Sequence, residues 1–434
     1  MAALAVTATA GTMLAGPARA DSVRDTEMWV LDALNVQPAW AATQGAGVVV
    51  AVIDSGVNPN VSDLAGSVTT GPDLTGVHTQ PTNPDWGVHG TWMASLIAGH
   101  GHDGGGSGII GVAPQSKILS IRVITDAGDP GFSRYEHESV SRGQKQLAAA
   151  IGYAVSHGAS VISMSLGYSL QSSIVRQALQ DAYEHDVVVV ASAGNSGEQA
   201  GASGAGHSPY SFPADYPGVL AVGAVNRQGQ PARFSSENLS VQVAAPGSQV
   251  PAQGRDGAYW LVSGTSPACA LTAGVAALIK SKYPQLTDPQ LITAIATSTT
   301  PSSRPSGGYN DRVGFGEVNA AAALKAAGKL ADRAAAPAGS RAGLQATGHF
   351  GGGVAAIPAP PVQPRGLSAL VLYCLLGACC LGLVTIAVSR LFTLRDAPPG
   401  YARDETEPAA GSAATRIVTG PPGRHAAPRS RGQQ

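Results

Sequence analysis

The segment Val262-Ser-Gly-Thr-Ser-Pro-Ala-Cys-Ala-Leu-Thr-Ala-Gly-Val-Ala-Ala-Leu-Ile279 decides the fold predicted for this chain. Its second half is almost wholly apolar and rich in Ala and Leu, which is typical of a helix buried on all sides. Gly264 permits a sharp turn before that helix, and Pro267 suits the first helical position, where a missing N–H costs nothing. Ser266 is then expected at the helix N-terminus, beside free N–H groups that can receive negative charge. Such a placement suits a nucleophile with an oxyanion site, although a lone serine there is more often a simple N-cap.

Asp54 directly follows the run Gly47-Val-Val-Val-Ala-Val-Ile53. Continuous β-branched residues are typical of a strand that is buried on both faces, as in a parallel sheet. Ligands of open α/β sheets bind at the carboxyl ends of the strands, so Asp54 is well placed to orient a catalytic imidazole. Asp-Ser-Gly also makes good turns, and a turn cap is the alternative interpretation.

Two further polar residues lie at predicted element ends. His89 opens an apolar, helix-patterned run that ends at Gly99, and Asn195 follows the predicted strand at residues 187–191 among glycines. A lone histidine is more often structural, and asparagine tolerates the left-handed turn conformation well. The functional interpretation of Asn195 is a side-chain amide that donates to an oxyanion. The glycine-rich stretch at 100–106 offers His-x-His-Asp but no rigid frame for a metal, so we expect a mobile surface loop there.

Strands and helices alternate along the predicted chain. This alternation indicates an α/β fold with a parallel sheet and helices on both faces. The strands are expected at residues 47–53, 117–124, 159–166, 187–191, 219–225 and 241–245, and the helices at 29–40, 89–99, 144–157, 172–185, 268–279 and 291–297.

Asp54, His89 and Ser266 occur in the order of the subtilisin-type catalytic triad. With Asn195 in Ala193-Gly-Asn-Ser-Gly197, they form four ordered motifs that resemble those of the subtilisin-like serine proteases (S8), from about residue 29 to residue 330. The resemblance implies a Ser266 nucleophile, a His89 base, an Asp54 orienter and an Asn195 oxyanion donor. It also implies a substrate-binding strand, which it assigns to Ser165, Leu166 and Gly167. No cofactor and no metal are predicted.

The nucleophile motif departs from the family's usual pattern. In the family, an alanine follows the serine and a proline stands further along, whereas here Pro267 follows Ser266 directly and Ala270 stands at the family's proline position. We expect Ala270 to leave the helix regular. Ser266 keeps its own N–H, so the backbone oxyanion donor that the resemblance implies is retained.

Composition limits the other classes of function. The chain has 434 residues, a formal net charge of −1 and 13% charged residues, and its main body has no basic cluster of the kind that binds nucleic acid. Of its four cysteines, only Cys269 lies outside the apolar run at 367–388, which excludes a disulfide framework in the predicted catalytic domain.

The two ends of the chain differ from its middle. Residues 1–20 are small and apolar and end in Ala18-Arg-Ala20, which predicts a secretory signal peptide. The catalytic domain is expected at 21–330, a Pro/Ala/Gly-rich linker at 331–366, a transmembrane helix at 367–389 and a disordered tail at 390–434. Seven arginines against four acidic residues follow the span, so the tail is expected in the cytoplasm and the catalytic domain outside.

This layout resembles the mycosins, membrane-anchored subtilisin-like proteases associated with type VII secretion. It predicts a single-pass, extracytoplasmic serine endopeptidase of the cell membrane, with protein or peptide substrates and with type VII secretion components as partners. The alternative is a catalytically idle, protease-like structural subunit of a secretion complex. Labelling with a serine-directed fluorophosphonate distinguishes these two hypotheses.

Overall fold

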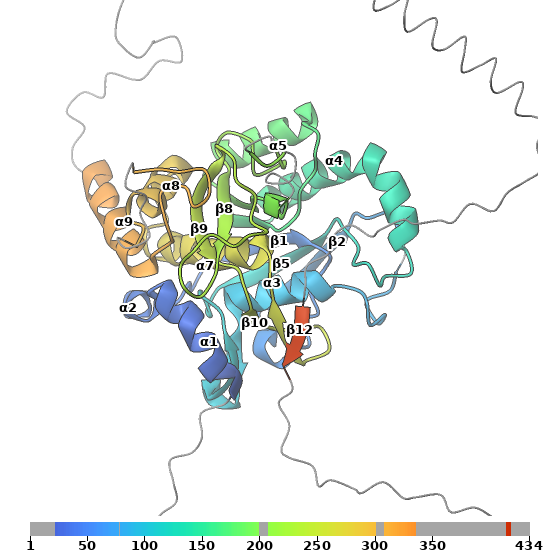
Figure 1. Cartoon of the computed structure of the whole chain (residues 1–434), viewed down its shortest axis with the longest axis horizontal. Coiled ribbons are helices and arrows are strands. Elements are labelled where there is room, and N and C mark those ends of the chain that lie inside the picture. Colours follow the sequence, from blue (N-terminus) through green and yellow to red (C-terminus); the bar gives the residue numbers. More distant parts are fainter. Residues whose placement is uncertain (1–21, 78, 199–206, 301–307, 336–413, 418–434) are drawn as a thin grey trace, which may run out of the picture. The chain divides into compact units, whose positions relative to one another are not determined.

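Seven parallel strands form the central sheet, in the order β2-β5-β1-β6-β7-β8-β9 (Figure 1). The computed structural model describes residues 22–77, 79–198, 207–300, 308–335 and 414–417. The predicted parallel α/β architecture is confirmed. The strands are β1 Val49–Asp54, β2 Val68–Asp73, β5 Lys117–Arg122, β6 Val161–Met164, β7 Val188–Ser192, β8 Leu220–Val225 and β9 Val241–Pro246.

Successive side chains of the buried strands point to opposite faces of the sheet, and each face packs into its own hydrophobic core. In β1, Val50 and Val52 belong to one core, whereas Ala51 and Ile53 belong to the other. This period of two is why an unbroken run of small β-branched residues fits the sheet centre. The larger core contains α1 Ser22–Ala33, α2 Val36–Trp40, α3 Val88–Ala98, α7 Thr265–Lys282, α8 Asp288–Thr297 and α9 Ala320–Ala335, and the smaller contains α4 Phe132–Ser156 and α5 Ser173–Glu184.

Helix α7 is the apolar segment at 262–279 that the sequence predicts to be buried, and its residues from Thr265 to Lys280 are all buried. Its close contact with the neighbouring layer depends on small residues. A Cβ added to Gly274 would lie 2.6 Å from the Cβ of Val112. The helix is therefore packed closely against the segment between β4 and β5.

The stretch at 100–106 is not the mobile loop that the sequence predicts. It belongs to an antiparallel hairpin of β3 His100–His102 and β4 Ser107–Ile110, with the short 3₁₀ helix η2 Asp103–Gly105 between the strands. His102 Nδ1 lies 2.7 Å from the buried Asp63 Oδ1, and Arg24 of α1 donates to the carbonyl of Gly108 at 2.6 Å. Side chains from distant parts of the chain thus fix the hairpin. The glycine content of residues 100–106 alone does not show these contacts. Asp63 lies in η1, Ser62–Leu64.

A second, smaller sheet has the order β10-β11-β12. Its first two strands are antiparallel: β10 Val250–Gln253 and β11 Tyr259–Val262. Strand β12, Ala414–Ile417, pairs with β11 and places Thr415 opposite Leu261. These four residues differ from the disordered tail predicted at 390–434.

The predicted domain ends are only partly covered by the structure. Helix α9 continues past the expected end of the domain at residue 330, to Ala335. The signal peptide at 1–20, most of the linker and the span at 367–389 lie outside the described residues. Within the described residues, no helix is both long enough and apolar enough to cross a membrane.

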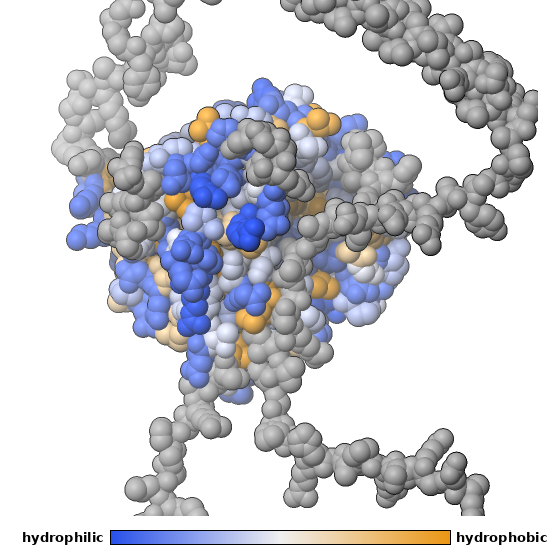
Figure 2. Space-filling model, viewed as in Figure 1, coloured by the Kyte–Doolittle hydropathy of each residue, from blue (hydrophilic) through white to orange (hydrophobic). Residues whose placement is uncertain are grey.

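The face of the described residues that Figure 2 shows is mostly hydrophilic, with apolar residues scattered over it. Three of the large exposed apolar side chains are Leu170, Tyr210 and Leu239. Single exposed apolar residues are normal on a soluble surface. Of these three, Tyr210 bears on function, because it lines a cavity that also contains Ser266.

Candidate active site

Asp54 is the last residue of β1, at the carboxyl edge of the sheet. Its side chain is buried, and its Oδ1 accepts from the N–H of Ser55 at 2.7 Å. The same oxygen lies 2.8 Å from His89 Nδ1. The other oxygen, Oδ2, is buried and has no hydrogen-bond partner. An oriented carboxylate of this kind fixes the imidazole's tautomer and stabilises its protonated form.

His89 is the second residue of α3, where the helix meets the end of β1. Gly90 permits this contact, because a Cβ at that position would lie 2.2 Å from the carbonyl oxygen of Gly56. The Gly90 N–H in turn donates to Ser55 Oγ at 3.0 Å. The absence of a side chain at Gly90 thus lets the start of α3 approach the end of β1 closely.

The electrostatic surroundings of His89 favour its charged form. Burial alone would lower the pKa of His89, but the charge and hydrogen bond of Asp54 and the charge of Asp126 outweigh burial and raise it. The imidazole side chain is 13% exposed and that of Asp54 is 1% exposed. The pair is thus poised to accept a proton in a site largely shielded from water.

Ser266 is the second residue of α7, because the helix begins at Thr265. Pro267 is therefore not at the first helical position, as the sequence predicts, but still lies in the first turn, where its missing N–H costs little. The Ser266 hydroxyl donates a hydrogen bond to the carbonyl oxygen of Ser165 at 3.5 Å. In return, Ser165 Oγ donates to the Ser266 carbonyl at 3.1 Å.

Thr265 orients the side chain of Asn195. The Asn195 Oδ1 accepts from the Thr265 N–H at 2.9 Å and from the Thr265 hydroxyl at 3.0 Å. The same hydroxyl accepts from the Gly194 N–H at 3.1 Å. With its oxygen engaged, the amide of Asn195 has only its NH₂ group left to meet a ligand. This is the orientation that an oxyanion donor requires.

A cavity of about 310 Å³ joins the residues predicted to bind substrate to the predicted nucleophile. Ser165, Leu166 and Gly167 follow β6 directly, and all three line the cavity together with Asn195 and Ser266. A Cβ on Gly167 would lie 2.2 Å from Ser211 Oγ, so a side chain there would require the Ser211 hydroxyl to move. The structure thus brings the predicted substrate strand, the predicted oxyanion donor and the predicted nucleophile to one cavity.

The chain matches the family described as "Subtilase family" over residues 45–316. It is a member of this family. Subtilisin DY of Bacillus licheniformis is 34% identical over 257 residues, which are 59% of this chain and 85% of that protein. The resemblance recognised in the sequence is confirmed, and this subtilase is a serine endopeptidase of the subtilisin type.

Two solved structures with a similar fold are mycosins. MycP1 from Mycobacterium smegmatis is 29% identical to this subtilase with a TM-score of 0.55, over 68% of this chain and 84% of that one. The MycP3 protease from the type VII (ESX-3) secretion system is 31% identical with a TM-score of 0.56, over 68% of this chain and 87% of that one.

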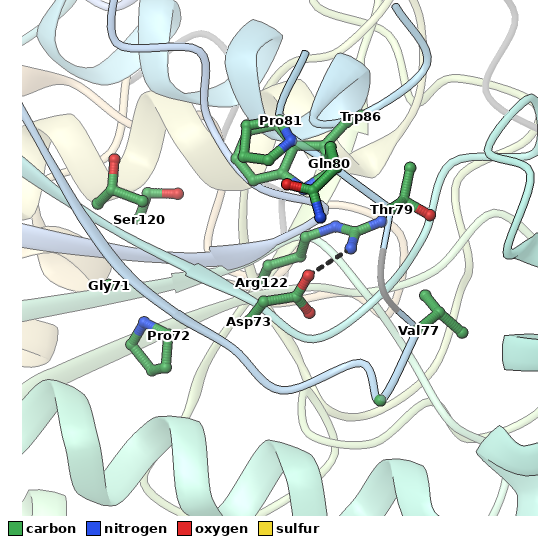
Figure 3. A pocket seen from close by; sticks show the side chains of 12 residues that line it. Gly71, Pro72, Asp73, Val77, Thr79, Gln80, Pro81, Trp86, Ser120 and Arg122 are labelled. Carbon is green, nitrogen blue, oxygen red and sulfur yellow. Dashed lines mark hydrogen bonds and ion pairs between the residues drawn. The ribbon is translucent and has the colours of Figure 1, made fainter. Parts of the chain in front are cut away.

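A second cavity, of about 300 Å³, lies beside the loop that precedes α3 (Figure 3). Arg122 at the end of β5 reaches its wall, where its guanidinium lies 5.6 Å from the ring of Trp86. Arg122 Nη1 pairs with Asp73 and its Nη2 with Asp129, each at 2.6 Å. Its Nε donates to the Ser55 carbonyl at 3.0 Å. Arg122 therefore ties three segments together next to Asp54.

Two residues of the candidate site, Thr265 and Asp126, are not predicted from the sequence. Thr265 stands in the quoted Gly264-Thr-Ser266 motif, but only the folded arrangement shows that it holds Asn195. Nothing in the sequence around Asp126 indicates a functional role, except that it lies shortly after a predicted strand. In the structure its carboxylate accepts from the backbone N–H of His89 at 3.1 Å.

Cys269, the only cysteine among the described residues, is buried and free. Burial raises the pKa of its thiol to about 11. It lies in α7 three residues after Ser266, with its sulfur 3.5 Å from the Val190 carbonyl. A thiol held protonated in the core is unreactive, so Cys269 is not a second nucleophile.

Proposed function

We propose that Ser266, His89 and Asp54 form the catalytic triad of this protease and that Asn195 and the Ser266 N–H form its oxyanion hole. The 2.8 Å contact between His89 Nδ1 and Asp54 Oδ1 carries the proposal. It is supported by the cavity that Ser266 shares with Asn195 and the substrate strand. Asp54 engages one ring nitrogen of His89, which leaves Nε2 to act on the nucleophile.

The reaction follows from these positions. His89 takes the hydroxyl proton of Ser266 as its oxygen attacks the carbonyl carbon of a peptide bond. The Asn195 NH₂ and the Ser266 N–H donate to the oxygen that becomes negative. The protonated His89 then gives its proton to the leaving amine, and water hydrolyses the acyl-enzyme by the same route in reverse.

Labelling with a fluorophosphonate tests the assignment of the nucleophile. Wild-type protein should be labelled, whereas Ser266→Ala should fold with an unchanged circular dichroism spectrum and remain unlabelled. Ser263→Ala is a matched control, because Ser263 precedes the same helix but has its hydroxyl engaged with Gln249. Undiminished labelling of Ser266→Ala would refute the triad.

We further propose that this protease is anchored in the cell membrane by residues 367–389, with its catalytic domain outside the cytoplasm. The support is the uncharged run at 367–388, the arginines that follow it and the secretory pattern at residues 1–20. Its substrates would then be exported or cell-surface proteins. Similarity to MycP3 of a type VII secretion system favours a role beside such a system.

The pairing of β12 with β11 argues against this topology. Strand β12 lies beyond the proposed span and β11 lies before it. One crossing of the membrane would put the two strands on opposite sides. The proposed topology therefore requires that this pairing be absent once the chain is inserted.

A further inference from the structure

Helix α3, which carries His89, has no side-chain cap of its own. Its N-cap residue is Gly87, in the left-handed conformation with φ of 73°. The first N–H groups of any helix need partners from elsewhere. Asp126 supplies them: its Oδ2 accepts from the Val88 N–H at 2.8 Å, and its Oδ1 accepts from the His89 N–H at 3.1 Å.

The loop that carries Asp126 is held at both of its ends. Arg122, the last residue of β5, pairs with Asp129 at 2.6 Å, so the segment from 122 to 129 is closed by one ion pair. The same guanidinium contacts Asp73 and Trp86 at the cavity wall (Figure 3). The loop therefore holds Asp126 in place at the start of α3. A carboxylate restrained in this way can fix the position of the first residues of the helix.

Several charged groups act on Asp126. Burial raises the pKa of Asp126; the charge of His89 and hydrogen bonds from the His89 N–H and Ser55 oppose this rise, and the charge of Asp54 adds to it. Among the cations nearby, Arg255 interacts with both Asp126 and Asp85. His89 thus has carboxylates from two neighbouring strand ends: Asp54 on its ring and Asp126 on its backbone.

We propose that Asp126 is a positioning residue of this protease, which fixes the backbone of His89 at the start of α3 and gives the imidazolium a second negative charge. The inference rests on the proposed function, since His89 must be the general base. A braced carboxylate at the helix start restrains the base in its reactive orientation. Its charge also favours the protonated form that the base adopts when it accepts the proton.

The rate of fluorophosphonate labelling as a function of pH tests this proposal. Replacing Asp126 by asparagine keeps the shape but removes the charge and one acceptor. Labelling at the alkaline plateau should fall roughly ten- to a hundredfold, as expected when a catalytic group loses its orientation. The acid limb of the pH–rate profile, where labelling falls as His89 becomes protonated, should move to lower pH. The reason is that the Asp126 carboxylate no longer favours the protonated imidazole over the neutral one.

Two variants serve as controls. Asp85→Asn removes a charge near the same loop, because a Cβ on Gly128 would lie 2.7 Å from Asp85 Oδ1. Asp85 accepts from no N–H of α3. The acid limb of the pH–rate profile of Asp85→Asn should therefore stay near that of wild type. Asp126→Glu keeps the charge and should retain the wild-type acid limb with a lower plateau. This variant also carries the test if Asp126→Asn does not fold, because a wild-type plateau in Asp126→Glu would then overturn the proposal.

The outcomes separate the two proposals. A profile of Asp126→Asn that superimposes on wild type would overturn the role of Asp126, and so would a lower plateau with an unmoved acid limb, since that is the mark of a purely structural cap. A wild-type protein that takes up no fluorophosphonate would instead refute the proposed function itself.

Discussion

Asn195 is held by a neighbour of the nucleophile, and this couples two parts of the site at the level of single residues. Thr265 donates to the Asn195 oxygen through both its N–H and its hydroxyl. It also precedes Ser266, so any shift of the start of α7 moves the proposed oxyanion donor and the proposed nucleophile together. The coupling keeps the distance between them constant, as transition-state stabilisation requires.

Removing the Asn195 amide should therefore lower turnover without weakening substrate binding. Asn195→Ala is expected to reduce kcat about 10²- to 10³-fold, with KM nearly unchanged, because the donor acts mainly on the charge of the transition state. Steady-state hydrolysis of a peptide substrate measures both constants. A rise in KM with an unchanged kcat would show that Asn195 binds the ground state instead.

Thr265→Val removes one of the two bonds that orient Asn195 and should lower kcat less, by about tenfold. Thr272→Val is its matched control, because Thr272 is a buried threonine of the same helix whose hydroxyl donates to the Ala268 carbonyl at 2.8 Å. Equal losses in the two threonine variants would indicate general destabilisation of α7.

At the scale of elements, α1 is attached to the β3–β4 hairpin through a buried acid. Glu27 accepts from the N–H of Ile110 and lies 3.3 Å from Arg24. Burial nevertheless raises the pKa of Glu27 from 4.5 to about 8, against the Ile110 hydrogen bond and the charge of Arg24. The folded protein thus binds a proton that the unfolded chain releases above pH 4.5.

This proton makes stability depend on pH. Between about pH 4.5 and pH 8 the folded state holds more protons than the unfolded state, so the free energy of unfolding should fall as pH rises through that window. Asp288 and Glu317, whose pKa values are raised to about 7 by burial, act in the same direction. Glu27→Gln should lessen the fall, so that its melting temperature exceeds that of wild type at pH 8 but not at pH 4.5.

Thermal unfolding at a series of pH values checks this expectation. Glu237→Gln is a suitable control, since Glu237 pairs with Arg312 at 3.0 Å at the surface. The role given to Glu27 is wrong if Glu27→Gln melts with the same dependence on pH as wild type.

The sequence predicts well the elements that carry a clear hydrophobic pattern, whether they are buried throughout, as β1 and α7 are, or on one side only, as α5 is. β1 and α7 carry unbroken apolar runs, and their ends place Asp54 and Ser266 correctly. β2, at the sheet edge, reads Val-Thr-Thr-Gly-Pro-Asp and is largely exposed, so it has no hydrophobic pattern to detect. The N-terminal half of α4 was likewise missed, because its residues 132–143 are mostly polar.

Contacts between distant segments explain what remains unpredicted in the site. Each of Asp54, His89, Asn195 and Ser266 stands at an element end, which is visible locally. Asp126 faces α3 only because β5 lies beside β1 in the sheet. No local pattern shows that a carboxylate after one strand reaches the start of a helix that precedes it in the chain.

For the whole molecule, the proposed membrane topology makes a prediction about the side on which the tail lies. Protease added to intact spheroplasts should digest the catalytic domain and spare a tag placed after Gln434, because the arginines after the proposed span resist translocation. A tag that is digested while the domain survives would reverse the orientation.

The β12 pairing gives an independent readout of the same question. Leu261 and Thr415 lie opposite each other in the register, so cysteines introduced at both positions can be joined by a short thiol cross-linker only if the strands pair. In the inserted chain no cross-link should form, and Thr415→Cys alone is the control for reaction with the native cysteines. Efficient cross-linking in membranes would exclude a single crossing between the two strands.

The order of the site residues along the chain also sets when activity can begin. Asp54, His89 and Asn195 all precede α7, and Ser266 arrives with the helix that fills the larger core. A nascent chain that has been synthesised only as far as β9 has the proposed base and the proposed oxyanion donor but lacks the proposed nucleophile. Until the chain has been extended past Ser266, it therefore cannot cleave a peptide bond by the proposed triad. Helices α8 and α9 of the larger core are synthesised after Ser266, so the proposed triad is complete in the chain before that core is.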